Sequence, residues 1–239
     1  MNHAPTSVLV IDDNDDLTEN IVEILDDLGV YVRVAGSGEE ALEIFDERRW
    51  DLVVTDVRMP GINGIELLAQ LKERSPGTPV LVMTGYADRD TRAAAHRSGA
   101  LAVVHKPLDL EAFIELIERV SAAETPVLIV DDDDALCSNL TDILGEQQGV
   151  LPHPAATLEL ARRLAACVDF HAALIDLRLP DGDGLSLARE LERRADGSRR
   201  PVIVMTGYPE ALEGAEEGVE VLAKPFPVPN LVERLREIV

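Results

Sequence analysis

The feature that most constrains this chain is an internal repeat of long period. Four segments occur twice, in the same order and separated by roughly half the chain. They are VLVIDDN at 8–14 with VLIVDDD at 127–133, TDVRMPGINGIELL at 55–68 with IDLRLPDGDGLSLA at 175–188, PVLVMTGY at 79–86 with PVIVMTGY at 201–208, and HKP at 105–107 with AKP at 223–225. Two homologous domains explain this order, and 239 residues accommodate both. We expect the first domain at 1–122 and the second at 123–239.

Within each copy, short aliphatic runs alternate with helical patterns. In the first copy one helical stripe is formed by Leu17, Ile21, Ile24 and Leu28, and Gly29 ends that helix. Further elements of the first copy are expected as strands at 51–56, 79–84 and 101–105 and as helices at 38–48, 64–74, 87–98 and 109–120. Continuous aliphatic strands are typical of parallel sheets that are buried on both faces. The sequence therefore predicts the α/β class, with a doubly wound (βα)₅ parallel sheet in each half.

The charge balance narrows the classes of partner. The chain carries 22 Lys and Arg against 45 Asp and Glu, a formal net charge of −23. Such a surface repels phosphate backbones and anionic lipid, so we expect no direct nucleic-acid or membrane partner. No signal peptide precedes Val8 and no apolar run is long enough to span a bilayer, so we expect a cytoplasmic location. The two cysteines, Cys137 and Cys167, form no metal motif or disulfide framework, and their helical patterns predict that both lie in the core.

Polar side chains follow the predicted strands at the edge where ligands gather in open α/β sheets. In the first copy these are Asp12, Asp13, Asp56, Thr84 and Lys106. The second copy supplies Asp131, Asp132, Asp176, Thr206 and Lys224. Three carboxylates in one cleft repel one another unless a cation lies among them, and oxygen ligands favour Mg²⁺ over Ca²⁺. A carboxylate beside Mg²⁺ and an ammonium can attack phosphorus, because both cations stabilise charge on the phosphoryl oxygens.

These residues resemble the receiver domain of bacterial two-component response regulators. The likeness rests on the acidic pair, the single Asp, the Thr and the Lys-Pro, and it recurs in both copies, ending at Lys106-Pro107 and Lys224-Pro225. It implies a flavodoxin-like fold and phosphorylation on Asp56 and Asp176 by a histidine kinase or phosphotransfer protein. It implies signalling through contacts with a downstream protein rather than metabolic catalysis, with self-catalysed phosphorylation and dephosphorylation, and it allows dimerisation.

The resemblance also implies how each site holds Mg²⁺. The expected ligands are Asp12, Asp13, Asp56 and the carbonyl of Arg58 in the first copy, and Asp131, Asp132, Asp176 and the carbonyl of Arg178 in the second. The peptide bond before each Pro is commonly cis in this family. Thr84 and Thr206 would turn toward the phosphoryl group and shift the loop that follows them.

Two departures from the family pattern bear on signalling. The family often carries an aromatic residue three positions before the lysine, but here those positions are Val103 and Val221. We therefore expect Tyr86 or Tyr208, in the loop after the threonine, to carry more of the signal. The second copy is also shorter between its Thr and Lys, and the glycine-containing segment 209–220 predicts a short or frayed fourth helix.

Other functions remain to be weighed against this one. The chain contains no kinase ATP motif and no helix-turn-helix, so it acts either as a stand-alone double receiver or as the amino-terminal part of a longer regulator or hybrid kinase. A Mg²⁺-dependent phosphatase with an aspartate nucleophile is a rival. Such enzymes carry a general acid two residues after the nucleophile, whereas Arg58 and Arg178 occupy those positions here.

Overall fold

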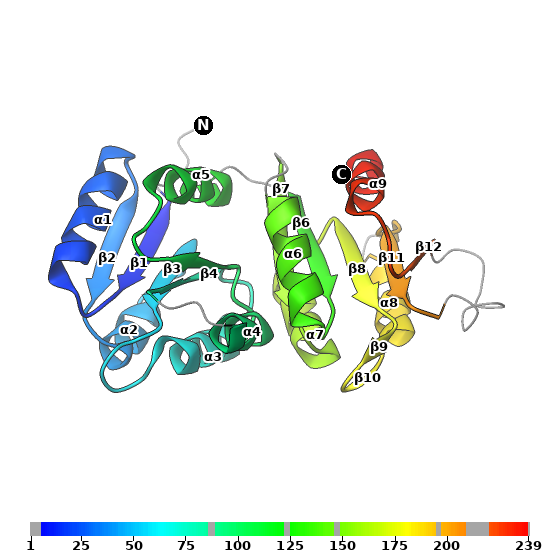
Figure 1. The fold of residues 1–239 in the computed structure, drawn as a ribbon, viewed down its shortest axis with the longest axis horizontal. Coiled ribbons are helices and arrows are strands. Elements are labelled where there is room, and N and C mark those ends of the chain that lie inside the picture. The colour runs from blue at the N-terminus through cyan, green and yellow to red at the C-terminus, as the bar shows by residue number, and fades with distance from the viewer. Residues whose placement is uncertain are drawn as a thin grey trace. The chain divides into compact units, whose positions relative to one another are not determined.

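The computed structural model describes residues 6–85, 89–121, 125–145, 149–194, 197–208 and 220–238. The chain divides into two compact units, Met1–Ala123 and Glu124–Val239. The boundary expected between 122 and 123 lies outside the described residues. Each unit is a layered α/β fold, shown as a ribbon in Figure 1.

In the first unit, strands and helices alternate along the chain. Its elements are β1 Ser7–Ile11, α1 Asp15–Asp27, β2 Tyr31–Ala35, α2 Gly38–Phe45, β3 Leu52–Asp56, α3 Gly64–Arg74, β4 Val80–Thr84, α4 Arg89–Arg97, β5 Ala102–His105 and α5 Leu110–Ser121. The strands form one parallel sheet in the order β2-β1-β3-β4-β5. Helices α1 and α5 cover one face of this sheet, and α2, α3 and α4 cover the other (Figure 1).

The second unit repeats this plan. Its elements are β6 Thr125–Val130, α6 Asp134–Gly145, β7 Val150–Ala155, α7 Leu158–Cys167, β8 Ala172–Asp176, β9 Arg178–Leu179, β10 Gly182–Asp183, α8 Gly184–Glu192, β11 Val202–Thr206, β12 Glu220–Ala223 and α9 Val228–Ile238. The parallel sheet has the order β12-β11-β8-β6-β7, which is the order of the first unit read from the other edge. The additional strands β9 and β10 form a two-stranded antiparallel hairpin directly after β8. The fourth helix expected in this copy falls at 209–220, and 209–219 lie outside the described residues.

Local sequence explains where α1 begins and ends. The Asn14 side chain accepts a hydrogen bond from the Leu17 N–H, and Asp15 and Asp16 place negative charge in the first turn, where the helix dipole favours it. After the helix, Gly29 adopts a φ of 72°, a conformation that glycine reaches at little cost. The helix buries Ile21 of the predicted stripe, together with Leu25, which the prediction did not include. Leu28, which was expected on the stripe, is 42% exposed because it lies after the last turn of the helix.

The central strands are fully buried, which is the physical reason for their unbroken aliphatic sequence. All five residues of β1, β3 and β4 are buried, and the same holds for β8 and β11. In the second unit, Leu128 and Val130 pack with α7 and α8, whereas Val127 and Ile129 pack with α6 and α9. These observations confirm the predicted doubly wound parallel sheets.

One expectation about the core is wrong. Cys137 lies inside, 3% exposed, and burial raises the pKa of its thiol to about 12. Cys167, in contrast, is exposed at the end of α7. The residues around it in the sequence are apolar, but Cys167 is the last residue of α7, where the side chain is open to solvent. Across the described part of the chain, none of the helices has the length and apolar character needed to cross a bilayer.

Candidate functional site

The fold brings four of the predicted side chains of each copy to one edge of its sheet. In the first unit, Asp12 follows β1, Asp56 ends β3, Thr84 ends β4 and Lys106 follows β5. Because β1, β3, β4 and β5 are adjacent and parallel, their carboxyl ends lie together. The second unit places Asp131, Asp176, Thr206 and Lys224 at the corresponding strand ends.

The lysine of each unit joins two carboxylates. Lys106 Nζ lies 2.5 Å from Asp12 Oδ2 and 2.7 Å from Asp56 Oδ1. Asp12 is almost completely buried and Asp56 is 5% exposed, so water screens these contacts poorly. The ammonium therefore points toward the predicted phosphoacceptor rather than away from it.

The second unit reproduces this arrangement. Lys224 Nζ lies 2.6 Å from Asp131 Oδ2 and 2.5 Å from Asp176 Oδ1. The peptide bonds Lys106–Pro107 and Lys224–Pro225 are both cis, as the resemblance led us to expect. Two copies with different surrounding sequence thus build the same ammonium–carboxylate contacts.

Backbone N–H groups hold the remaining carboxylate oxygens. Asp56 Oδ2 accepts from the Arg58 N–H at 2.7 Å, and Asp176 Oδ2 accepts from the Arg178 N–H at 2.7 Å. Each of these two aspartates is therefore fixed through one oxygen by the lysine and through the other by its own loop. Asp12 and Asp131 are held in the same way by backbone N–H groups two residues further on.

The electrostatics of the site follow from burial and pairing. Burial opposes the charge of Lys106, but hydrogen bonds and Coulombic attraction from Asp12 and Asp56 outweigh it and raise the pKa of the lysine. The same balance raises the pKa of Lys224 beside Asp131 and Asp176. Burial also raises the pKa of Asp131, against the stabilising contact with Lys224. Both lysines are therefore fixed cations at neutral pH.

The donor chemistry fits Mg²⁺, although the carboxylates do not converge as a ready-made cage. Asp13 and Asp132, the second member of each acidic pair, are exposed. Within the described ranges, no three Asp, Glu, His or Cys side chains gather as a metal-binding group. The lysine ammonium, not a third carboxylate, lies between Asp12 and Asp56. Carboxylate and carbonyl oxygens with access to water are nevertheless the ligands that Mg²⁺ prefers.

The threonines lie at the ends of the fourth strands, where they were predicted. Thr84 is 1% exposed and Thr206 is 2% exposed. Thr206 Oγ1 accepts a hydrogen bond from the Tyr208 N–H at 3.0 Å, which connects the strand end to the loop that follows. Tyr86, the counterpart of Tyr208, lies outside the described residues.

Sequence reasoning missed two glycines that the site requires. A Cβ atom at Gly64 would lie 2.0 Å from the carbonyl oxygen of Asp56, and one at Gly184 would lie 1.9 Å from that of Asp176. The helices α3 and α8 therefore begin directly against the backbone of the two aspartates. The signal was present in the sequence, because both glycines occupy the same position of the repeated segment.

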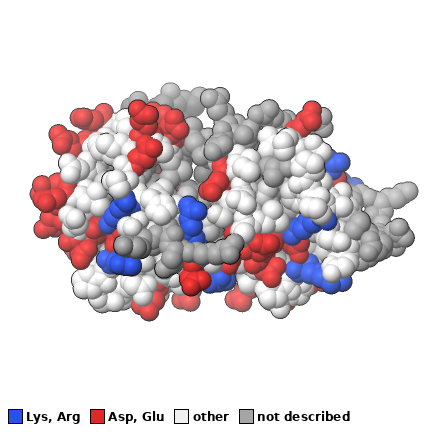
Figure 2. Space-filling view, in the orientation of Figure 1, with Lys and Arg blue, Asp and Glu red and all other residues white. Residues whose placement is uncertain are grey.

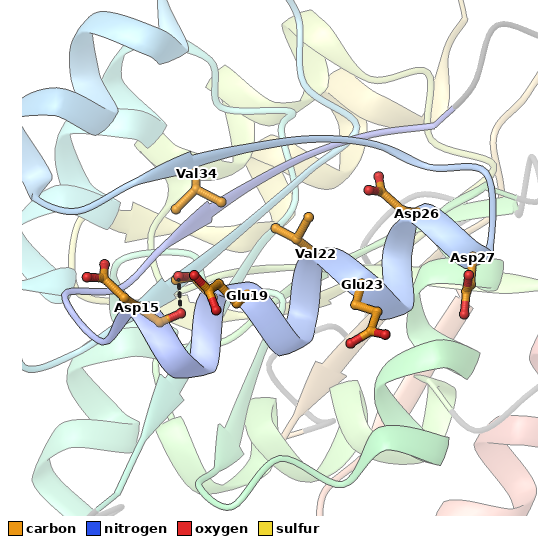
Figure 3. A pocket seen from close by; sticks show the side chains of 8 residues that line it. Asp15, Glu19, Val22, Glu23, Asp26, Asp27 and Val34 are labelled. Carbon is orange, nitrogen blue, oxygen red and sulfur yellow. Dashed lines mark hydrogen bonds between the residues drawn. The ribbon is translucent and has the colours of Figure 1, made fainter.

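A separate cavity of about 640 Å³ lies along α1 and contains none of the predicted site residues. Figure 3 shows Val22 of α1 pointing toward the strand β2 that carries Val34, with the carboxylates of Glu19 and Glu23 nearby on the helix. Acidic side chains gather on this part of the first unit (Figure 2). This surface agrees with the acidic composition and is distinct from the strand-end site.

Comparisons with known proteins identify the family to which these features correspond. A family model described as the response regulator receiver domain matches the chain twice, at residues 8–118 and 127–236. A response regulator receiver protein of Anaeromyxobacter sp. (strain Fw109-5) is 36% identical over 230 residues, covering 95% of this chain and 94% of that protein.

Other relatives share only part of their length with the chain. The transcriptional regulatory protein ZraR of Klebsiella oxytoca is 30% identical over 210 residues, and the match spans 86% of this chain but 44% of ZraR. Among solved structures, the chemotaxis protein CheY4 of Vibrio cholerae is 28% identical over 49% of this chain and 99% of that structure, with a TM-score of 0.47.

Proposed function

The chain belongs to the response regulator receiver domain family and contains two receiver domains of a two-component response regulator in tandem, and from this premise we propose that Asp56 and Asp176 are its phosphoacceptors. The observation that carries the proposal is the pair of short contacts from one ammonium to the acidic residue after the first strand and to the aspartate that ends the third. Among the described residues, Asp56 and Asp176 are the pair of equivalent aspartates that are buried, end a strand and contact a lysine ammonium in this way.

The chemistry assigned to each aspartate is nucleophilic attack on phosphorus. A carboxylate oxygen of Asp56 or Asp176 forms the new P–O bond as the bond between phosphorus and the donor's leaving atom breaks, which gives an acyl phosphate. We assign the donor to a histidine kinase or phosphotransfer protein, and the leaving imidazole of such a donor takes up a proton from solvent.

The other residues hold charge where the transfer needs it. Lys106 and Lys224 are positioned to follow the phosphoryl group, because each already contacts the oxygen Oδ1 of the attacking aspartate. Thr84 and Thr206 would each donate a hydroxyl hydrogen to another phosphoryl oxygen. The backbone N–H groups of Arg58 and Arg178 hold oxygen Oδ2 and so fix which way the carboxylate faces.

Receiver domains bind Mg²⁺ at this acidic site, and we assign its ligands here. Asp13, Asp56 and the carbonyl of Arg58 would hold the ion in the first unit, with Asp12 as a further ligand. Asp132, Asp176, the carbonyl of Arg178 and Asp131 are the counterparts in the second. When bound, Mg²⁺ neutralises negative charge on the phosphoryl oxygens.

Signalling follows from a change of state rather than from turnover of a metabolite. Phosphorylation adds negative charge at the strand ends, and a coupling of roughly 1–3 kcal/mol is typical for transmission from such a site to a partner surface. We propose that each receiver uses this difference to change its contacts with a downstream protein. Each receiver would also catalyse its own phosphorylation from a small donor, and self-catalysed hydrolysis of the acyl phosphate would reset the switch.

The proposal is tested by counting phosphates on the intact chain. The wild type, Asp56→Asn, Asp176→Asn and the double variant are incubated with acetyl phosphate and Mg²⁺, and their masses are measured at once. We expect up to two phosphates on the wild type, up to one on each single variant and none on the double variant. Asp46→Asn is the matched control, because Asp46 is an exposed carboxylate whose partner is Arg74, away from the site. Acid-stable phosphate, or phosphate on the double variant, would contradict the assignment.

A further inference from the structure

Beside the second phosphoacceptor, an arginine lies on a tyrosine ring. The guanidinium carbon of Arg178 is 4.3 Å from the centroid of the Tyr208 ring, a cation–π contact. Arg178 begins β9, two residues after Asp176, and Tyr208 follows β11, two residues after Thr206. The contact therefore joins the two segments that carry the acceptor and the threonine.

The backbone of both residues is tied to the site. The Arg178 N–H donates to Asp176 Oδ2 at 2.7 Å, and the Tyr208 N–H donates to Thr206 Oγ1 at 3.0 Å. Their side chains, unlike their backbones, are open to solvent, since Arg178 is exposed and Tyr208 is 51% exposed. The main chain of each residue is thus fixed at the strand ends, while the side chains are free to exchange partners at the rim.

The guanidinium has no stronger partner in the described parts of the chain. Among the described residues of the second unit, ion pairs with acidic side chains are made by Arg162, Arg194, Arg199, Arg200 and Arg234, but not by Arg178. Both oxygens of the nearby Asp176 are already engaged, one by Lys224 and the other by the Arg178 N–H. The described residues therefore give this guanidinium no carboxylate partner, although its own backbone N–H contacts the aspartate where new negative charge would appear.

We propose that Arg178 is a phosphoryl-binding residue of the second receiver, and that its guanidinium exchanges the Tyr208 ring for the phosphoryl group of Asp176. This inference rests on the proposed function, because it requires that Asp176 is the acceptor. Hydrogen bonds between a guanidinium and a phosphoryl group are charge-assisted and can be bidentate, so they outcompete a cation–π contact at an exposed position.

The exchange gives the second receiver a readout that its sequence otherwise lacks. Val221 occupies the position where an aromatic residue would respond to the threonine, and a valine cannot reorient a ring. Release of Tyr208 would free a half-exposed ring at the start of the loop after β11. The end of β11 then responds to phosphorylation through Arg178 as well as through Thr206.

The test uses the full chain carrying Asp56→Asn, so that only the second site can take up a phosphoryl mimic. Beryllofluoride is titrated in the presence of Mg²⁺, and its affinity is measured by calorimetry. We expect Arg178→Gln to weaken binding about tenfold, the lower range for loss of a hydrogen bond between opposite charges. Arg178→Lys should retain part of the affinity. Arg189→Gln, an exposed arginine on α8, is the control for the change in net charge and should bind as the parent does.

The tyrosine provides a prediction of opposite sign. Tyr208→Leu removes the competitor for the guanidinium, so we expect beryllofluoride to bind about two- to fivefold more tightly, the equivalent of an exposed cation–π contact. In the Arg178→Gln background the same change should have no effect. Weaker binding by Tyr208→Leu, or an equal effect in both backgrounds, would overturn the exchange. If no variant of the folded chain binds beryllofluoride, the proposed function fails and this inference fails with it.

Discussion

A buried lysine in the first unit allows a prediction whose size follows from its environment. Lys72 on α3 is 6% exposed, and its Nζ donates to the carbonyl oxygens of Pro76 at 3.1 Å and Thr78 at 2.8 Å. Burial lowers the pKa of Lys72 from 10.5 to about 7, because the charged form loses its hydration. The Lys72 ammonium joins two carbonyl groups of the turn between α3 and β4, but burying its charge destabilises the folded unit.

This lowered pKa makes the stability of the first unit depend on pH. Between about pH 7 and 10.5 the unfolded chain binds more protons at Lys72 than the folded unit does, so stability rises with pH across this window. Below pH 7 both states are protonated, and the cost of burying the charge is present in full. At 1.36 kcal/mol per pKa unit, raising the pH from 7 to 9.5 should contribute about 3 kcal/mol to the free energy of unfolding.

Tryptophan fluorescence allows unfolding of the first unit to be followed separately from that of the second. Trp50 is the single tryptophan of the chain and is 4% exposed in the first unit, so its fluorescence follows unfolding of that unit in urea. The free energy of unfolding is measured at several pH values for the wild type and for Lys72→Met, which keeps most of the side-chain volume. Groups other than Lys72 titrate in both proteins, and their effects cancel in the difference. A difference that stays constant from pH 7 to 9.5 would refute the reasoning.

Three further substitutions probe the backbone around the phosphoacceptors and the start of α7. Gly64→Ala and Gly184→Ala should each destabilise their unit by at least about 1–3 kcal/mol in thermal unfolding, because the new methyl group meets the carbonyl of Asp56 or Asp176. Both substitutions should also reduce the phosphate uptake measured by intact mass. Gly207→Ala is the control and should be neutral, because nothing lies within 4 Å of the added Cβ. Asp181→Ala should lower the free energy of unfolding of the second unit by about 0.5–2 kcal/mol, because Asp181 accepts hydrogen bonds from the Leu158 and Glu159 N–H groups at the start of α7. Denaturation followed by circular dichroism measures the change. A smaller loss would show that Thr157 caps the helix alone.

Much of the fold could be predicted from the sequence because the relevant signals are local and are present twice. The helical spacing and the glycine after α1 are properties of neighbouring residues, and the strand at 52–56 was expected within one residue of its observed start. The repeat then fixed the number of domains without any knowledge of their packing. Once the order of strands and helices is known, the parallel sheet follows, and with it the edge where Asp56 and Lys106 meet.

The contacts at that edge could not be predicted in the same way. Lys106 and Asp12 are 94 positions apart in the chain, and Lys224 and Asp131 are 93 apart, so only closure of the sheet decides which oxygen each ammonium reaches. The apolar patterns around Cys137 and Cys167 look alike, but the turn of the helix on which each lies decides that one is buried and the other exposed.

The sequence by itself determined the two-domain architecture, the order of the elements and the residue types at the strand ends. The tertiary structure alone decided that Gly184 must lie against Asp176, that each acceptor shares a lysine with the acidic residue after the first strand, and that Arg178 rests on Tyr208. The physical reason is that periodicity and turn chemistry depend on near neighbours, whereas these contacts join strand ends that chain folding brings together from distant positions.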